Sequence, residues 1–126
     1  MKLQESGEMY LETLYILSRG SDTVRSLDIA EYRGFSKPSV SRAVGILGKS
    51  GFITVDPKGY LHLTPHGEEV AKKIFERHTL ITELLVSIGV PREVAEDDAC
   101  KIEHDVSDVS FEALRVFYET RNKGRE

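Results

Sequence analysis

The sequence predicts a mainly α-helical fold with one small β-hairpin, arranged as two domains in series. Apolar residues recur every three or four positions over most of the chain, which is the helical period. Two short runs rich in β-branched and aromatic residues flank the turn Asp56–Gly59, which indicates a hairpin. Charge also divides along the chain, with six basic and three acidic side chains over residues 24–62 and two basic against eight acidic over residues 92–112. We therefore expect domains at 1–64 and 65–126.

Three helices are predicted ahead of the hairpin. Apolar spacing predicts the first over Glu5–Ser18. Ser26 is the predicted N-cap of a short second helix that ends near Gly34. Ser36 is the predicted N-cap of the third, and Gly51 ends that helix as a left-handed C-terminal cap.

The predicted strands of the hairpin are Phe52–Val55 and Tyr60–Thr64. A helix, a short helix, a turn, a second helix and a hairpin follow one another within about 60 residues, which is the order of a winged helix-turn-helix. Thr64 then caps a long helix that reaches about Ile88. A fifth helix is expected over Pro91–Asp105, and a sixth from Ser107 or Ser110 to about Tyr118.

The helix that follows Ser36 has a face suited to double-stranded DNA. Serine hydroxyls and backbone N–H groups bind phosphates, while longer donors reach base edges. A winged helix used only for protein contacts is the alternative, and the local charge surplus of +3 favours DNA. The residues predicted to contact DNA are Ser36, Lys37, Pro38, Ser39, Ser41, Arg42, Lys49, Lys58 and Tyr60.

Composition excludes several classes of protein. The chain has no apolar run near the roughly 18 residues of a membrane span and no apolar core of a secretory signal at its N-terminus. Its single cysteine cannot form an internal disulfide, which favours the reducing cytoplasm. No nucleophile triad, paired catalytic carboxylates or phosphate-binding glycine loop stands out, so we do not expect an enzyme.

A metal site is predicted in the acidic half of the chain. Cys100, Glu103 and His104 are spaced i, i+3 and i+4 on the predicted fifth helix, so they share one face. A thiolate, a carboxylate and an imidazole on one face form a candidate site for a divalent metal, with a solvated acidic face as the alternative. Spacing alone does not show that further candidates converge there; by default Met9 is a core residue and His78 an ordinary histidine.

The chain resembles the diphtheria toxin repressor and manganese transport regulator family over nearly its whole length. The resemblance implies a cytoplasmic homodimer, activated by Fe(II) or Mn(II), that represses genes of metal homeostasis by binding palindromic operators. It also implies a winged helix domain followed by a helical domain for metal binding and dimerisation. The residues that carry the resemblance are Glu8–Tyr15, Leu63–Gly67, Arg77–His78 with Leu84–Leu85, and Ala99–Asp108.

The resemblance also implies a ligand set. The iron branch of the family matches Met9, Cys100, Glu103 and His104 here, and a second metal of the manganese branch matches Glu12 and His78. The chain departs from the iron branch at Thr82 and Glu96, where that branch carries a Glu and a His, and it ends without the C-terminal barrel domain of many members. We expect a metal site that combines ligands typical of the iron branch with ligands typical of the manganese branch.

The soft donors Met9 and Cys100 favour Fe(II), and Co(II), Ni(II) or Zn(II) in vitro, whereas carboxylates and imidazoles favour Mn(II) as the alternative. Apolar residues of the last two helices are expected either at the dimer interface or in the domain's own core. Two other functions stay open: a metal-independent winged helix regulator, and a small metal carrier or metalloenzyme that does not bind DNA. The apolar residues of the last two helices that are expected at the dimer interface or in the core are Val94, Ile102, Val106, Phe111 and Leu114.

Overall fold

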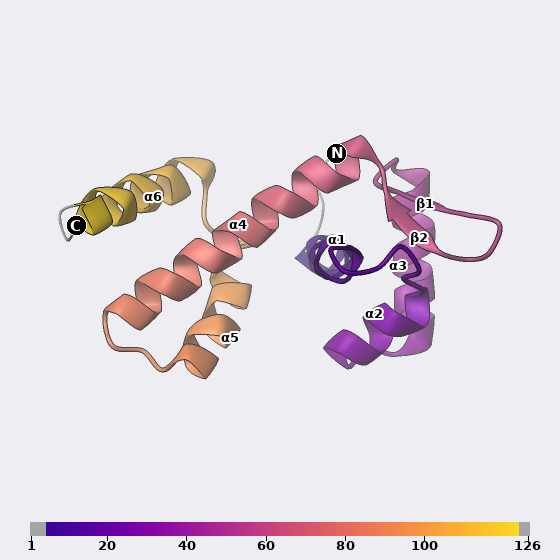
Figure 1. The fold of residues 1–126 in the computed structure, drawn as a ribbon, viewed down its shortest axis with the longest axis horizontal. Helices are drawn as coiled ribbons and strands as arrows, with labels where there is room; N and C mark the ends of the chain where they lie inside the picture. The colour runs from indigo at the N-terminus through magenta and orange to yellow at the C-terminus, as the bar shows by residue number, and fades with distance from the viewer. Residues whose placement is uncertain (1–4, 124–126) are drawn as a thin grey trace. The chain divides into compact units, whose positions relative to one another are not determined.

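The computed structural model describes residues 5–123, and within them it has six helices and one antiparallel hairpin (Figure 1). The chain divides into two compact units between Lys73 and Ile74, inside the fourth helix. In the described part, no helix is long and apolar enough to cross a membrane. The elements are α1 (Glu5–Ser18), α2 (Ser26–Arg33), α3 (Lys37–Lys49), β1 (Ile53–Val55), β2 (Leu61–Leu63), α4 (Pro65–Ser87), α5 (Arg92–Ile102) and α6 (Asp108–Lys123).

The first unit is the winged helix-turn-helix that the element order predicts. Helices α1, α2 and α3 contact one another, and the hairpin packs on α1 and α3. The apolar positions of α3 bury Val40 and Leu47 completely and Val44 partly. The buried core consists of Leu11, Leu14, Val24, Ile29, Ala30, Val40, Leu47, Phe52, Ile53, Leu61 and Ala71.

Caps fix where α2 and α3 begin and end. Ser36 is the N-cap of α3, and its Oγ accepts a hydrogen bond from the backbone N–H of Ser39 at 3.3 Å. Gly34 ends α2 with a φ of 73°, a left-handed conformation that glycine adopts without strain. The predicted cap of α2 is wrong by one residue, because Arg25 is the N-cap and Ser26 is already helical. The carboxylate of Asp28 accepts the backbone N–H of Arg25 at 2.8 Å and so stabilises that start.

One carboxylate organises the tip of the hairpin. Ile53 pairs with Leu63 and Val55 with Leu61 across the two strands. Asp56 Oδ1 accepts the backbone N–H groups of Lys58 and Tyr60, and its Oδ2 lies 2.9 Å from Nε2 of His62. The hydrogen bond with His62 holds the pKa of Asp56 below its ordinary value.

Helix α4 begins in close contact with the hairpin. The backbone N–H of Thr64 donates to Phe52 O at 3.0 Å, and the Thr64 hydroxyl lies 3.2 Å from the same oxygen. That hydroxyl also accepts the backbone N–H of Gly67, as a helix cap does. The close approach leaves no room for a side chain at Gly67, whose Cβ would lie 1.9 Å from Phe52 O.

The second unit contains the rest of α4 with α5 and α6. Helix α5 ends at Ile102 and not near Asp105, so Glu103 is its C-cap and His104 lies in the following turn. The predicted common helix for the metal-site residues is wrong for this reason. The guanidinium of Arg77 donates to the carbonyl of Glu103, one of the carbonyls that the end of the helix leaves without a partner inside the helix. Helix α6 runs to Lys123, beyond the predicted end.

Candidate metal centre and nucleic-acid interface

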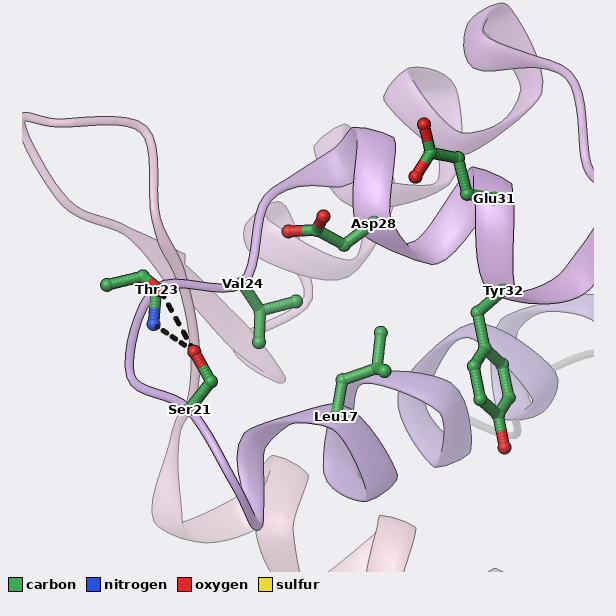
Figure 2. Close-up of a pocket in the computed structure, with 7 residues that line it drawn as sticks. All are labelled: Leu17, Ser21, Thr23, Val24, Asp28, Glu31 and Tyr32. Atoms are coloured by element: carbon green, nitrogen blue, oxygen red, sulfur yellow. Dashed lines mark hydrogen bonds between the residues drawn. The ribbon is translucent and has the colours of Figure 1, made fainter.

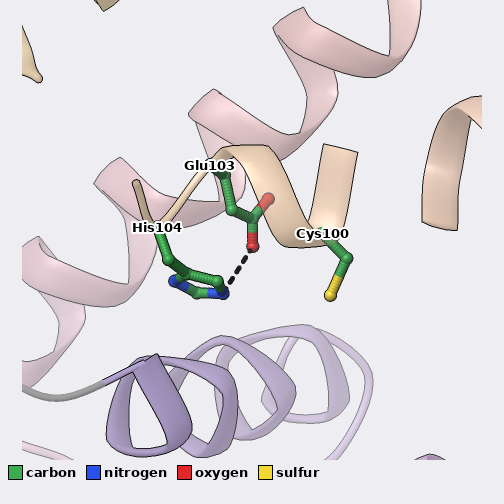
Figure 3. Close-up of side chains that lie close together, drawn as sticks. All are labelled: Cys100, Glu103 and His104. Atoms are coloured by element: carbon green, nitrogen blue, oxygen red, sulfur yellow. Dashed lines mark ion pairs between the residues drawn. The ribbon is translucent and has the colours of Figure 1, made fainter. Parts of the chain in front are cut away.

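The end of α5 brings together three side chains of different donor types. The ligand atoms of Cys100, Glu103 and His104 all lie within 4.8 Å of one another, although only Cys100 is in the helix (Figure 3). Glu103 and His104 have side chains that are 0% and 2% exposed, and Cys100 is half-buried. The turn therefore brings together the three side chains that helical spacing predicts to share one face.

Glu103 lies at the centre of this cluster. Its Oε2 lies 2.9 Å from Nδ1 of His78, on α4. Its Oε1 lies 3.3 Å from Nε2 of His104 and forms no hydrogen bond with any residue that the structure describes. A buried carboxylate oxygen without a donor costs free energy unless a cation or water satisfies it. Four of the six predicted metal-site residues therefore lie together in the second unit: Cys100, Glu103 and His104 at the end of α5, and His78 on α4.

The other two, Met9 and Glu12, lie on α1 in the first unit. Glu12 is buried and its Oε1 lies 3.5 Å from the guanidinium of Arg33. The same Arg33 donates from Nε to the Thr13 hydroxyl at 2.7 Å, and that hydroxyl donates to the carbonyl of Met9. These bonds fix the middle of α1, while the convergence of Met9 and Glu12 with the second unit's residues stays a prediction.

The two departures from the iron branch lie at very different positions. Thr82 is buried in α4, whereas Glu96 is exposed on α5. A threonine hydroxyl is a poor substitute for a carboxylate as a metal ligand, and an exposed glutamate has no enclosed site around it. Neither residue adds to the Glu103 cluster.

The donor set at the end of α5 fits a divalent cation. It offers sulfur, oxygen and nitrogen from three residues, and His78 bonds to the same carboxylate. Thiolate and imidazole ligands suit Fe, Co, Ni and Zn, and carboxylate with imidazole suits Mn. The oxygen of Glu103 that lacks a donor among the described residues is the observation of this structure that favours a cation over a simple ion-pair cluster.

The predicted DNA-contacting residues lie at the surface of the first unit. The seven from Ser36 to Lys49 are all exposed, as is Lys58 at the hairpin tip, whereas Tyr60 is half-buried. Ser36 also donates from its hydroxyl to that of Ser39 at 2.7 Å, so the two serines act together at the start of α3. A hollow of about 190 Å³ lies beside them and is lined by Ser26, Leu27, Lys37 and Ser41.

This face includes one basic residue that the sequence pattern did not single out. The guanidinium of Arg25 stacks on the Tyr60 ring at 4.6 Å from its centroid, so the start of α2 contacts the hairpin tip. A Cβ at Gly59 would lie 3.7 Å from the same guanidinium. In the sequence, Arg25 is distinguished only by its place in the positively charged stretch. No local pattern indicates that the start of α2 and the hairpin tip meet.

A second hollow of the first unit is lined by acidic side chains instead of basic ones (Figure 2). It measures about 560 Å³ and is lined by side chains of α1, α2 and the loop between them. Asp28 and Glu31 contribute carboxylates to its wall, which disfavours phosphate. The remaining lining residues are Leu17, Ser21, Thr23, Val24 and Tyr32.

Comparison with known proteins gives concordant results. The model of the iron-dependent repressor N-terminal DNA-binding domain matches residues 2–63, and that of the repressor's metal-binding and dimerisation domain matches residues 64–123. The transcriptional regulator MntR of Escherichia coli O6:H1 is 34% identical over 108 residues, which are 86% of this chain and 70% of that protein. The diphtheria toxin repressor of Corynebacterium glutamicum is 35% identical over 84% of this chain and 47% of its own length.

A solved structure, that of the manganese regulator SloR, superposes with a TM-score of 0.80 at 29% identity. The alignment covers 94% of this chain and 55% of SloR. The chain therefore spans about half the length of SloR and of the diphtheria toxin repressor, and more than two thirds of MntR.

Proposed function

Because this chain belongs to the iron-dependent repressor family of metal-dependent transcriptional regulators, we propose that it is a homodimeric repressor that binds operator DNA when Fe(II) occupies its metal site. The family consists of regulators and not of enzymes, and we assign no catalytic residue. Its site of action is the cytoplasm, where the operator DNA is. The observation that carries the proposal is the cluster of Cys100, Glu103 and His104 around a buried carboxylate, in a chain that also has an exposed basic helix face.

DNA binding is assigned to α3 and the hairpin of residues 1–64. Lys37 and Arg42 place positive charge on the exposed face of α3, and the paired hydroxyls of Ser36 and Ser39 lie at its N-terminus. A helix N-terminus with hydroxyl and basic side chains is suited to phosphates and base edges in the major groove. Lys58 at the hairpin tip then contacts the backbone beside that groove, with Tyr60 held by Arg25.

Metal binding is assigned to six residues, of which four come from residues 65–126. Cys100, Glu103 and His104 form the centre, and His78 shares the carboxylate of Glu103. Met9 and Glu12 complete the set by their donor types and by the family resemblance. A bound divalent cation supplies positive charge that compensates the clustered carboxylates and thiolate. Without compensation these groups repel one another, which leaves the DNA-reading units of a dimer without one fixed spacing.

Dimerisation is assigned to the second unit. The metal-binding and dimerisation model of the family covers α4, α5 and α6. Val94, Ile102 and Leu114 are exposed apolar side chains there, which favours an interface over a core for these three, whereas Phe111 is half-buried. A dimer presents two recognition helices at half-sites spaced about 34–36 Å apart.

Anaerobic DNA binding tests the proposal. The purified chain is treated with a chelator and titrated into a duplex that spans the region upstream of its own gene. We expect tight binding only after Fe(II) is added, and the variant Glu103→Gln should need far more metal. Binding that is equally tight with the chelator present would contradict the proposal and favour a metal-independent regulator. Metal binding without retardation of any duplex at low salt would favour a metal carrier.

Metal identity has its own test. The double variant Met9→Asp and Cys100→Glu replaces a thioether and a thiolate with carboxylates and leaves Glu103 and His104 in place. Carboxylates favour Mn(II), so activation should move from Fe(II) toward Mn(II) at equal free metal. Operator binding at fixed free Fe(II) or Mn(II) measures the change. A wild type that already prefers Mn(II), or a double variant of unchanged preference, would contradict the choice of iron.

A further inference from the structure

Arg77 is a buried arginine on α4, 8% exposed, next in sequence to the metal-site residue His78. Its Nη1 donates to the carbonyl of Glu103 at 3.2 Å and to that of Val106 at 2.8 Å. Its Nη2 donates to the carboxylate of Asp108, the first residue of α6. One guanidinium thus binds both ends of the segment between α5 and α6.

Two of these acceptors belong to the turn that carries the candidate ligands. Glu103 is the C-cap of α5 and still donates its backbone N–H to Ala99 O at 2.9 Å, whereas His104 lies in the turn that follows the helix. Arg77 supplies donors to the carbonyls of Glu103 and Val106, on either side of His104. Charge-assisted hydrogen bonds from a planar guanidinium restrict both the position and the tilt of the groups they bind.

Stability alone gives little reason for this buried charge. The guanidinium carbon lies 5.0 Å from the centroid of the Phe111 ring, in a setting where an apolar side chain would also pack. The Nε atom of Arg77 is buried and makes no hydrogen bond with the residues described. Replacing a buried ion pair as a whole with well-packed hydrophobic side chains is often neutral or stabilising, so such a pair is weak evidence of a role in stability.

We propose that Arg77 is a positioning residue for the metal site. It holds residues 103–108 as one piece, so that Glu103 and His104 are oriented for a cation before one binds and the start of α6 is fixed with them. This inference rests on the proposed metal site. Residues that orient metal ligands from outside the coordination shell typically contribute about 10–100-fold to metal affinity.

The test uses variants that separate charge, shape and packing. Arg77→Lys keeps the charge but loses the planar fork, and Arg77→Met keeps packing against Phe111 but loses all three hydrogen bonds. Arg115→Gln is the matched control, because Arg115 also pairs with two carboxylates but does so on the exposed side of α6. Co(II) is the probe, since a Cys100 thiolate ligand gives an absorption band that reports the geometry of the site.

We expect both Arg77 variants to lose about 10–100-fold in Co(II) affinity. The band at saturating Co(II) should change in position or intensity, whereas the helix content of the apo-protein should not. The Arg115 variant should match the wild type in both. Unchanged Co(II) affinity in the Arg77 variants would overturn the inference. A weakened affinity with an unchanged band at saturation would also overturn it, because only folding would then be affected.

Asp108→Ala keeps the inference testable if the Arg77 variants do not fold. Its side chain is 75% exposed, so truncation leaves the interior intact. Glu112→Ala removes the same charge from the next turn of α6 and serves as the control. We expect Asp108→Ala to weaken Co(II) binding several-fold beyond the control, and equal affinities would overturn the inference. Failure of the proposed function is distinct, since the wild type would then show no metal-dependent DNA binding.

Discussion

Replacing Gly67 with alanine should destabilise the first unit, although alanine is the better helix former. The new Cβ would lie 1.9 Å from Phe52 O and 2.8 Å from its carbonyl carbon. The two backbone segments must therefore separate by about 1.1 Å to reach even a 3.0 Å contact. That movement strains the backbone hydrogen bond from Thr64 N–H to the same oxygen, and with it the Thr64 hydroxyl, which donates to the adjacent carbonyl of Gly51 at 2.7 Å.

Overpacking of this kind costs about 1–3 kcal/mol, and each weakened hydrogen bond adds up to about 1 kcal/mol. The higher helix propensity of alanine stabilises the folded state by at most about 1 kcal/mol. We therefore expect the free energy of unfolding to fall by about 2–3 kcal/mol. Urea denaturation followed by far-UV circular dichroism measures it.

Gly45→Ala is the matched control for this measurement. Gly45 is exposed in the middle of α3, and a Cβ there meets nothing within 4 Å. This variant should be about 0.8–1 kcal/mol more stable than the wild type. If Gly67→Ala were also as stable as the wild type or more so, the close packing of α4 on the hairpin would be refuted.

Three further predictions address the first unit. Ser36→Ala removes the cap of α3 and should cost about 1 kcal/mol in thermal or urea unfolding, whereas Ser41→Ala on the same helix should cost much less. Arg42→Ala should weaken operator binding, and the slope of log affinity against log salt concentration should fall by about one unit if Arg42 contacts a phosphate. If the loss of affinity is confined to one base pair and is worth about 1–3 kcal/mol, Arg42 instead contacts a guanine. Asp56 has a lowered pKa when folded, so its carboxylate stabilises the hairpin tip at neutral pH, and this contribution is lost only as pH falls below 3.8 through the lowered value. The amide chemical shift of Tyr60 should report that loss, and a tip that loosens between pH 7 and 5 would contradict the assignment to Asp56.

Local signals in the sequence were sufficient for most of the fold. The cap at Ser36, the left-handed glycine at Gly34 and the start of α4 at Pro65 all depend on residues within one turn of the position concerned. The winged helix order follows from these elements alone. The cap of α2 was misplaced because Ser26 is a favoured cap residue, while the Asp28 carboxylate stabilises a start at Arg25.

Long-range contacts account for what the sequence did not predict. Helical spacing places Glu103 and His104 with Cys100 on one helix, but α5 ends before them, and the Glu103 carbonyl is bound by Arg77, 26 residues away in the sequence. The ligands nevertheless come together, since the C-cap residue Glu103 keeps a near-helical backbone. The contact of Arg25 with Tyr60 likewise joins segments that no local pattern relates.

Coupling between metal and operator is the central claim, and thermodynamic reciprocity tests it most directly. The Fe(II) affinity of the purified chain is measured anaerobically by competition with a chelator, with and without saturating duplex from upstream of its own gene. If one chain couples the two sites, the duplex must tighten Fe(II) binding by the same factor by which Fe(II) tightens duplex binding, typically about 5–150-fold. An Fe(II) affinity that is identical with and without bound duplex would contradict the account.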